Sequence, residues 1–170
     1  PCVTTDTPWN KIPLVYSDNV QSSKEAVKYL HSLNHTRIAH IAGPQTAISG
    51  RERLEGYRYG MMDENLPYDP DMIVIAPEYD TKSGYEAMKT LLSHPNPPTA
   101  VFVMCDLSAI GAIQAVREAG LKVGRDISIM GFDDIQIAAN VIPPLTTMRQ
   151  DKASIGHALG QTLIKLINKE

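Results

Sequence analysis

The sequence predicts an α/β protein with a mainly parallel sheet flanked by helices. Short apolar runs of strand length alternate along the chain with longer segments whose apolar residues recur every three or four positions, which is typical of βα units. The 170 residues are 43% hydrophobic and 21% charged, which is enough apolar material for one buried core in a single domain of ordinary composition.

The first half of the chain contains two predicted βα units. A short apolar run at 14–16 is expected to be a strand, and Ser22 with Glu25 has the spacing of a capping box that opens a helix. A continuous apolar strand follows at 37–42, and a helix is expected over about 51–65. The apolar stripes of these two helices are Val27, Leu30 and Leu33, and Leu54, Tyr57 and Met61.

The same alternation continues through the middle of the chain. Strands are predicted at 72–76 and 100–104, and helices at 81–93 and 108–119. Gly120 ends the second of these helices, because glycine readily adopts the left-handed conformation at that position.

The last third begins with a predicted strand at 127–130. An irregular stretch through 143–144 leads to a short strand at 146–148, and the chain continues into an amphipathic helix. The apolar stripe of that helix is Ile155, Leu159, Leu163 and Leu166.

Polar side chains follow the predicted strands, where open parallel sheets bind ligands. Carboxylates and guanidinium groups hold vicinal hydroxyls or base edges by paired hydrogen bonds, and an aromatic ring covers the apolar face of a sugar or base. The rim therefore suits a polyol or a nucleoside. The candidates are Asp18, Ser49, Arg51, Arg53, Tyr79, Asp106 and Asp133.

Each candidate also has a structural interpretation. Asp106 and Asp18 precede helices and could serve as N-caps, and one of Asp133 and Asp134 could only shape its turn. Arg53 could be a surface charge on its helix. The coincidence of these groups on one rim is the argument for a binding site.

Composition excludes several classes of function. The net charge of −3 and the scattered charges argue against a nucleic-acid or membrane surface in this segment, and no apolar run approaches the roughly 20 residues of a membrane span. The two cysteines and five scattered histidines predict neither a disulfide framework nor a metal site. Dinucleotide, P-loop and zincin motifs are absent. We expect no cofactor, and Cys105 is the one candidate nucleophile.

Three longer motifs resemble the effector-binding core of the lac/gal repressor (LacI/GalR) family of bacterial transcription regulators. Upstream, the segments 35–44 and 53–57 continue the resemblance, so it covers nearly the whole chain. The motifs are Cys105-Asp106-x-x-Ala109-Ile110-Gly111-Ala112, Gly131-Phe132-Asp133-Asp134 and Pro143-Pro144-Leu145-Thr146-Thr147-x-x-Gln150.

The resemblance implies a two-lobed, periplasmic-binding-protein-like module with the effector between the lobes. Residues 17–149 would form the C-terminal lobe, 1–16 the end of the N-terminal lobe, and 150–170 a crossover and a helix returning to that lobe. The DNA-binding helix-turn-helix would be absent from these residues.

The resemblance also assigns effector-binding residues. Arg53 and Asp133 match family residues that contact effector hydroxyls or base atoms, and Tyr79, Ser49 and Gln150 match further contact positions. Asp106 matches as well, although a helix cap is the alternative. Cys105 departs from the family, which often has Asn there, and a thiol is a poor hydrogen-bond partner.

The apolar segment 135–142 lies where family members pair their C-terminal lobes. Ile137, Ala138 and Val141 are therefore expected at a homodimer interface, with packing on the chain's own core as the alternative.

The function that follows is a non-enzymatic, cytoplasmic effector sensor of a LacI-type regulator. Its effector would be a pentose, nucleoside, purine or other sugar, and operator DNA would be bound only by the missing N-terminal domain. Two alternatives are a periplasmic solute-binding protein of a sugar transporter and an α/β enzyme that uses Cys105.

Overall fold

The computed structural model describes residues 13–168, and its centre is a five-stranded sheet in which every neighbouring pair of strands is parallel. The strand order is β2-β1-β3-β4-β5, so β1, β3 and β4 are interior strands and β2 and β5 are edge strands. The predicted fold class is confirmed. The strands are β1 (Ile38–Ala42), β2 (Ile73–Ile75), β3 (Ala100–Val103), β4 (Ser128–Asp133) and β5 (Thr146–Arg149).

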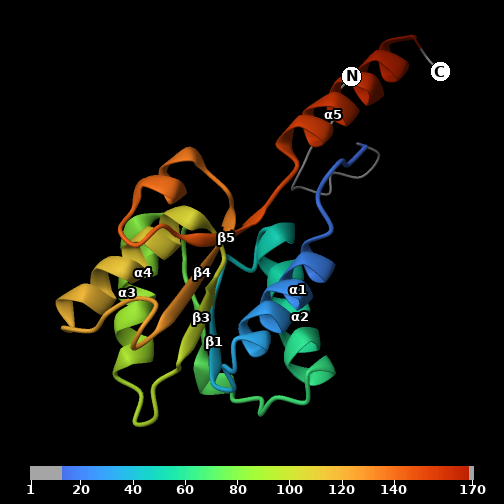
Figure 1. The fold of residues 1–170 in the computed structure, drawn as a ribbon. Helices are drawn as coiled ribbons and strands as arrows, with labels where there is room; N and C mark the ends of the chain where they lie inside the picture. The colour runs from blue at the N-terminus through green and yellow to red at the C-terminus, as the bar shows by residue number, and fades with distance from the viewer. Residues whose placement is uncertain (1–12, 169–170) are drawn as a thin grey trace.

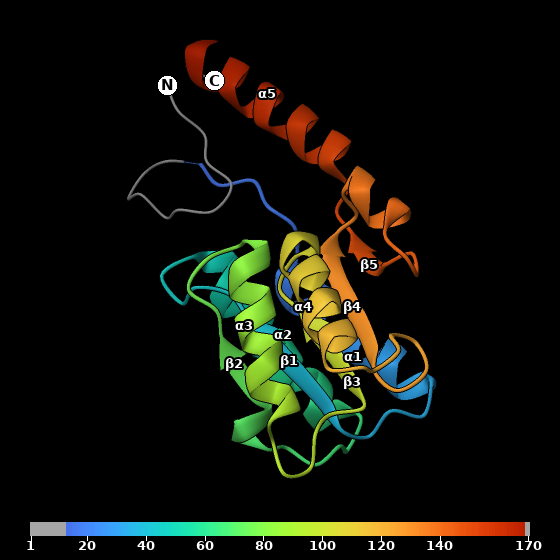
Figure 2. The same ribbon diagram turned by 90° about the vertical axis from the view of Figure 1, so that its left-hand side faces the viewer.

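Helices cover both faces of the sheet. Figures 1 and 2 show α1 and α2 on one face and α3 and α4 on the other, as expected for right-handed crossovers that reverse side along the sheet. The helices are α1 (Asn19–Ser32), α2 (Ile48–Asp63), α3 (Thr81–Leu92), α4 (Asp106–Glu118) and α5 (Lys152–Asn168), with short 3₁₀ segments η1 (Pro70–Met72) and η2 (Gln136–Asn140).

The two faces of the sheet have separate cores, because alternate residues of each strand point to opposite sides. On β1, Ala39 and Ile41 pack beneath α3 and α4, whereas Ile38 and Ala42 pack beneath α1 and α2. The helices of each pair also pack closely on one another. A side chain at Gly111 of α4 would overlap the backbone carbonyl of Thr81 on α3.

The first predicted elements differ from the structure. The strand expected at 14–16 is not formed, and only Leu14 makes a single bridge. Helix α1 begins three residues before Ser22, at Asn19, because the carboxylate of Asp18 accepts the backbone N–H of Gln21 at 2.9 Å. The Ser22–Glu25 pair therefore lies inside the helix, and Asp18 has the capping role. Of the segment expected to end an N-terminal lobe, residues 1–12 lie outside the described residues.

Helix α5 differs from the other four. It follows β5 and extends away from the sheet (Figure 1), and none of its described residues is buried. Its predicted apolar stripe is present, and Ile155 and Leu159 face the cleft described below. Toward its end, Ile164 and Ile167 are each 59% exposed.

Candidate functional site

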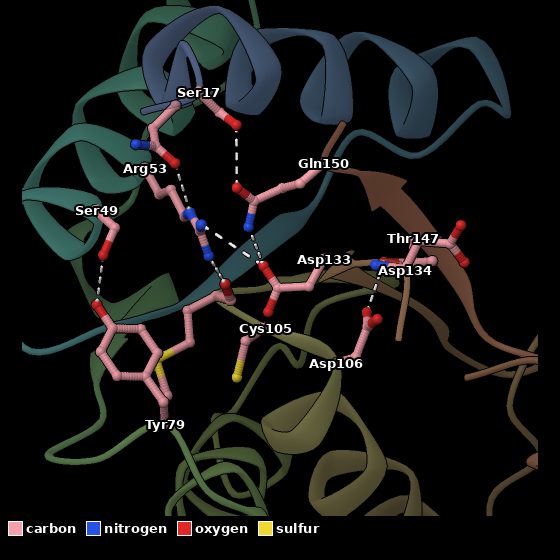
Figure 3. A network of polar contacts seen from close by, with 12 residues as sticks. Ser17, Ser49, Arg53, Tyr79, Cys105, Asp106, Asp133, Asp134, Thr147 and Gln150 are labelled. Carbon is pink, nitrogen blue, oxygen red and sulfur yellow. Dashed lines mark hydrogen bonds and ion pairs between the residues drawn. The ribbon is translucent and has the colours of Figure 1, made fainter. Parts of the chain in front are cut away.

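The candidate residues lie together at the carboxyl ends of the parallel strands (Figure 3). Ser49 and Arg53 lie in the first turns of α2 after β1, Tyr79 follows β2, and Asp133 is the last residue of β4. They line a cleft of about 290 Å³. The remaining lining residues are Cys105, Leu107 and Ile135. An adjoining cleft of about 360 Å³ shares Ser49 and Arg53 and is bordered by Gln150 and the first turns of α5.

Arg53 is only 5% exposed, and its guanidinium group is contacted on several sides. It lies 3.7 Å above the centre of the Phe132 ring, a cation–π contact. Its Nε donates to Asn19 Oδ1 at 3.0 Å, and Nη1 donates to the carbonyl of Met104. Nη2 lies 3.7 Å from Asp133 Oδ1. This network fixes a positive charge at the end of the sheet, where it needs no rearrangement to meet a polar ligand.

Asp133 is the carboxylate that faces this charge. Gln150 donates its amide N–H to Asp133 Oδ1, and Ser17 donates to Gln150 Oε1 at 3.0 Å. Burial raises the pKa of the Asp133 carboxyl, while the Arg53 guanidinium and the Gln150 amide lower it. Because its side chain remains 25% exposed, Asp133 combines a fixed position with access to the cleft. The Asp133 carboxylate can accept hydrogen bonds from ligand hydroxyls, and the Arg53 guanidinium beside it can donate to them.

Tyr79 has a defined orientation. Its phenol oxygen lies 3.0 Å from Ser49 Oγ, and the ring lies so close to Gly43 that a Cβ there would be 2.9 Å from the phenol oxygen. Glycine at 43 therefore makes room for the ring, and Ser49 holds its hydroxyl. The aromatic face predicted from the sequence is present in the cleft lining.

Asp106 is brought to the same end of the sheet but does not line the cleft. It is fully buried and accepts hydrogen bonds from the hydroxyl of Thr147 and the backbone N–H of Ile135, the latter at 2.8 Å. Its pKa is raised by burial. The capping alternative is not realised either, because the N-cap of α4 is Cys105, which makes no side-chain cap bond.

Three lining residues were not predicted as binding residues. Leu107 and Ile135 follow directly after Asp106 and near Asp133, but apolar residues at these places also fit an ordinary helix or turn. Cys105 was considered as a nucleophile and as a departure from the family's Asn, which made a hydrogen-bonded contact there doubtful. Burial raises the pKa of its thiol, which lies 3.3 Å from Ser108 Oγ, and a high pKa disfavours the reactive thiolate.

The expected dimer segment is partly exposed. Ile137 is 51% exposed and Val141 half-buried, whereas Ala138 is buried against the chain's own core. Within residues 13–168, no group of three or more His, Cys, Asp or Glu side chains could hold a metal ion. No helix in that range is long and apolar enough to cross a membrane.

With this geometry in view, comparison with known proteins identifies the family. The family model for the periplasmic binding protein-like domain matches residues 27–170. The chain belongs to the periplasmic binding protein-like domain family. Within that family it is 39% identical over 156 residues to the ribose operon repressor of Escherichia coli K12, and 39% identical over 146 residues to the HTH-type transcriptional repressor CytR of the same strain.

These alignments cover most of this chain but less than half of each relative. The shares are 92% of this chain and 47% of the ribose operon repressor, and 86% and 42% for CytR. Among solved structures, a LacI-family regulatory protein from Chloroflexus aggregans is 33% identical, with a TM-score of 0.87 over 95% of this chain and 58% of that one. The predicted resemblance to LacI/GalR effector-binding domains is confirmed, and these relatives are transcriptional regulators, not transport proteins.

Proposed function

We propose that this periplasmic binding protein-like domain is the effector-sensing part of a bacterial LacI-type transcription regulator. A small sugar, nucleoside or purine would bind in the cleft and alter the affinity of the whole protein for operator DNA. The observation that supports this is the fixed Arg53–Asp133 pair, with Tyr79 beside it, at the ligand-binding end of a fold shared with transcriptional repressors.

The cleft chemistry suggests a ligand with two unlike edges. Asp133 and Arg53 offer paired, charge-assisted hydrogen bonds to vicinal hydroxyls. Another wall of the cleft is apolar, because it consists of Leu107, Ile135 and Cys105, whose thiol forms only weak hydrogen bonds. We therefore favour a pentose or a nucleoside over a hexose, because these ligands have fewer hydroxyls to satisfy at that wall.

Six residues are assigned roles in this proposal. Arg53, Asp133, Tyr79 and Ser49 would surround the ligand, and Gln150 would hold Asp133 while bordering the crossover to α5. Asp106 would act from beneath the cleft. No enzymatic step and no cofactor enter the proposal. Residues 17–149 form one lobe in it, and 150–170 connect to the other.

Coupling to DNA would operate through a shift between two arrangements of the whole protein. If the effector binds one arrangement more tightly, it shifts the population toward that arrangement and changes operator affinity, and operator DNA changes effector affinity by the same factor. DNA contact is assigned to a domain outside these 170 residues, since the net charge here is −3. Such a protein would act in the cytoplasm.

The whole protein would be a homodimer. Val141 and Ile142 line a cleft of about 540 Å³ together with residues of α4. Ile142 is 77% exposed, and Ile137 of the same segment is 51% exposed. A second copy seated there would cover these apolar side chains. Ala138 would support this surface from within.

The test is calorimetric titration of the full chain against pentoses, hexoses, nucleosides and purines. Asp133→Asn keeps an oxygen that can accept from Gln150 but removes the charge. We therefore expect it to lower the affinity for the compound that binds by more than about tenfold, roughly 1.4 kcal/mol. Asp63→Asn, at the exposed ion pair with Lys24, is the matched control and should leave affinity unchanged. Absence of binding across the panel, or equal affinities for both variants, would contradict the proposal.

A further inference from the structure

The turn that carries Asp133 has an unfavourable backbone conformation. Asp133 has a φ of 112° and Asp134 a φ of 52°, both in the region that favours glycine. Residues in such conformations are strained and persist only where surrounding contacts determine them. The contacts that hold this turn therefore decide where the Asp133 carboxylate lies.

Two side chains inside the protein accept hydrogen bonds from backbone N–H groups of the turn. Asp106 Oδ2 accepts the N–H of Ile135 at 2.8 Å, and Thr147 Oγ1 accepts the N–H of Asp134 at 3.4 Å. The hydroxyl of Thr147 in turn donates to Asp106 Oδ1 at 2.5 Å. Two successive N–H groups of the turn are thus bound by one connected pair, which we call the bracket (Asp106 and Thr147; Figure 3).

Strand β4, beneath the turn, leaves space for the carboxylate of Asp106. A Cβ at Gly131 would overlap Asp106 Oδ1, so β4 has no side chain where the bracket lies. Asp106 is fully buried, while its neighbours Cys105 and Leu107 line the cleft. A ligand in the cleft can reach Asp133 but not Asp106.

Ordinary helix capping does not explain Asp106. Its hydrogen bonds go to the turn and to β5, at positions 29 and 41 residues away, and its own helix has Cys105 as N-cap. A buried carboxylate is costly unless hydrogen bonds or opposite charges compensate it. Its partners here are the elements that place Asp133.

We propose that Asp106 and Thr147 are positioning residues, which hold the 133–135 turn so that Asp133 faces Arg53 and Gln150. The turn is also contacted from the end of β5, where Arg149 Nε lies 2.6 Å from Asp134 Oδ2, and from the start of α5, where Lys152 donates to the carbonyl of Asp134 at 3.0 Å. These exposed contacts hold the outside of the turn, whereas the bracket holds its N–H groups.

The first test needs no ligand. Crystal structures of the full chain would be compared for Thr147→Val, which removes the hydroxyl at nearly constant volume, for Thr147→Ser, which keeps it, and for Asp106→Asn. In Thr147→Val and Asp106→Asn we expect the backbone of Asp133 to leave the positive-φ region and its carboxylate to lose the hydrogen bond from Gln150. In Thr147→Ser we expect Asp133 to stay in place. Should Asp133 keep its conformation in Thr147→Val, the positioning role is refuted, whether or not Asp106→Asn folds.

The second test rests on the proposed function and uses D-ribose as the probe. Thr147→Val should weaken D-ribose binding about tenfold in the unaltered chain but have no further effect when Asp133 is already replaced by Asn. Equal losses in both backgrounds would indicate a general structural role and overturn the proposal. If D-ribose does not bind the unaltered chain, the preference for a pentose fails, while the crystal structures still decide whether the bracket positions Asp133.

Discussion

The two faces of the sheet are built from different side chains. Beneath α3 and α4 the core is aliphatic, with valine, isoleucine, methionine and alanine. Beneath α1 and α2 the same strands present His40, Phe102 and Phe132, and Tyr57 of α2 donates its hydroxyl to the carbonyl of Ile38 at 2.7 Å. The His40 ring stacks between Tyr57 and Phe102, with ring centres 5.0 and 4.8 Å away.

This difference corresponds to the position of the cleft. Phe132 ends the aromatic series and lies directly beneath the guanidinium group of Arg53, so the α1–α2 face continues into the candidate site. The α3–α4 face provides close helix packing and holds the start of α4 against the sheet. One face therefore determines the electrostatics of the site, and the other determines how rigidly it is supported.

The largest expected effect is on the aliphatic face. Gly111→Ala would place a methyl group on the carbonyl of Thr81, so α3 and α4 would have to separate, and we expect a loss of about 3 kcal/mol or more in unfolding free energy. Gly156→Ala on α5 meets nothing within 4 Å and should instead stabilise by about 0.5–1 kcal/mol through helix propensity. Chemical denaturation measures both, and equal effects would show that the close packing of α3 on α4 is unimportant.

The next effect is on the aromatic face. Arg53→Met keeps much of the volume over Phe132 but removes the donor to the Met104 carbonyl and Asn19 Oδ1 and the positive charge beside Asp133, so we expect about 2–3 kcal/mol of destabilisation. Arg58→Met is the control, since Arg58 is exposed and its Nε donates to the Tyr68 hydroxyl at 3.2 Å. This variant should change stability by less than about 0.5 kcal/mol. Similar losses would contradict a structural role for the buried guanidinium.

Most of the fold could be predicted from the sequence because the strands are short apolar runs between strongly periodic helices. Arg53 and Asp133 could be found as well, since polar residues that follow parallel strands converge at one edge of the sheet. Helix starts were less predictable. The Ser22–Glu25 spacing and the Asp18 cap are both valid local signals, and only packing of the whole helix selects Asp18.

The remaining features depend on contacts between distant segments. Asp106 has the sequence position of an N-cap, but its partners lie 29 and 41 residues away, beyond any local pattern. Ala138 lies in a 3₁₀ segment of five residues, which is too short for a periodicity to reveal which side chain points inward. Leu107 and Ile135 join the cleft only because the ends of β3 and β4 are neighbours.

His40 should give the aromatic face a pH dependence that the aliphatic face lacks. Burial, with smaller contributions from Arg53 and Arg58, lowers its pKa from 6.5 to about 4, although the Phe102 carbonyl raises it. The folded-state pKa is depressed, so the unfolded chain binds the proton first and stability falls as pH drops from about 6.5 toward 4. Between pH 8 and pH 5 the loss should be about 2 kcal/mol. Chemical denaturation of His40→Gln should show a loss of unfolding free energy between pH 8 and pH 5 that is smaller by about 2 kcal/mol than in the unaltered chain. An equal loss in both proteins would exclude His40 as the cause.

The smallest effects are expected where the helices end. Asn34 follows α1 with a φ of 68°, whereas Gly120 follows α4 with a φ of 77°. Because glycine adopts this conformation without steric cost, Asn34→Gly should stabilise the α1–α2 face by about 0.5 kcal/mol, and Gly120→Ala should destabilise the α3–α4 face by about 1 kcal/mol. Both positions are exposed, and nothing lies within 4 Å of a Cβ at 120, so packing contributes little. Thermal unfolding with opposite signs for the two variants would show that backbone conformation alone separates these helix ends, and the same sign for both would refute it.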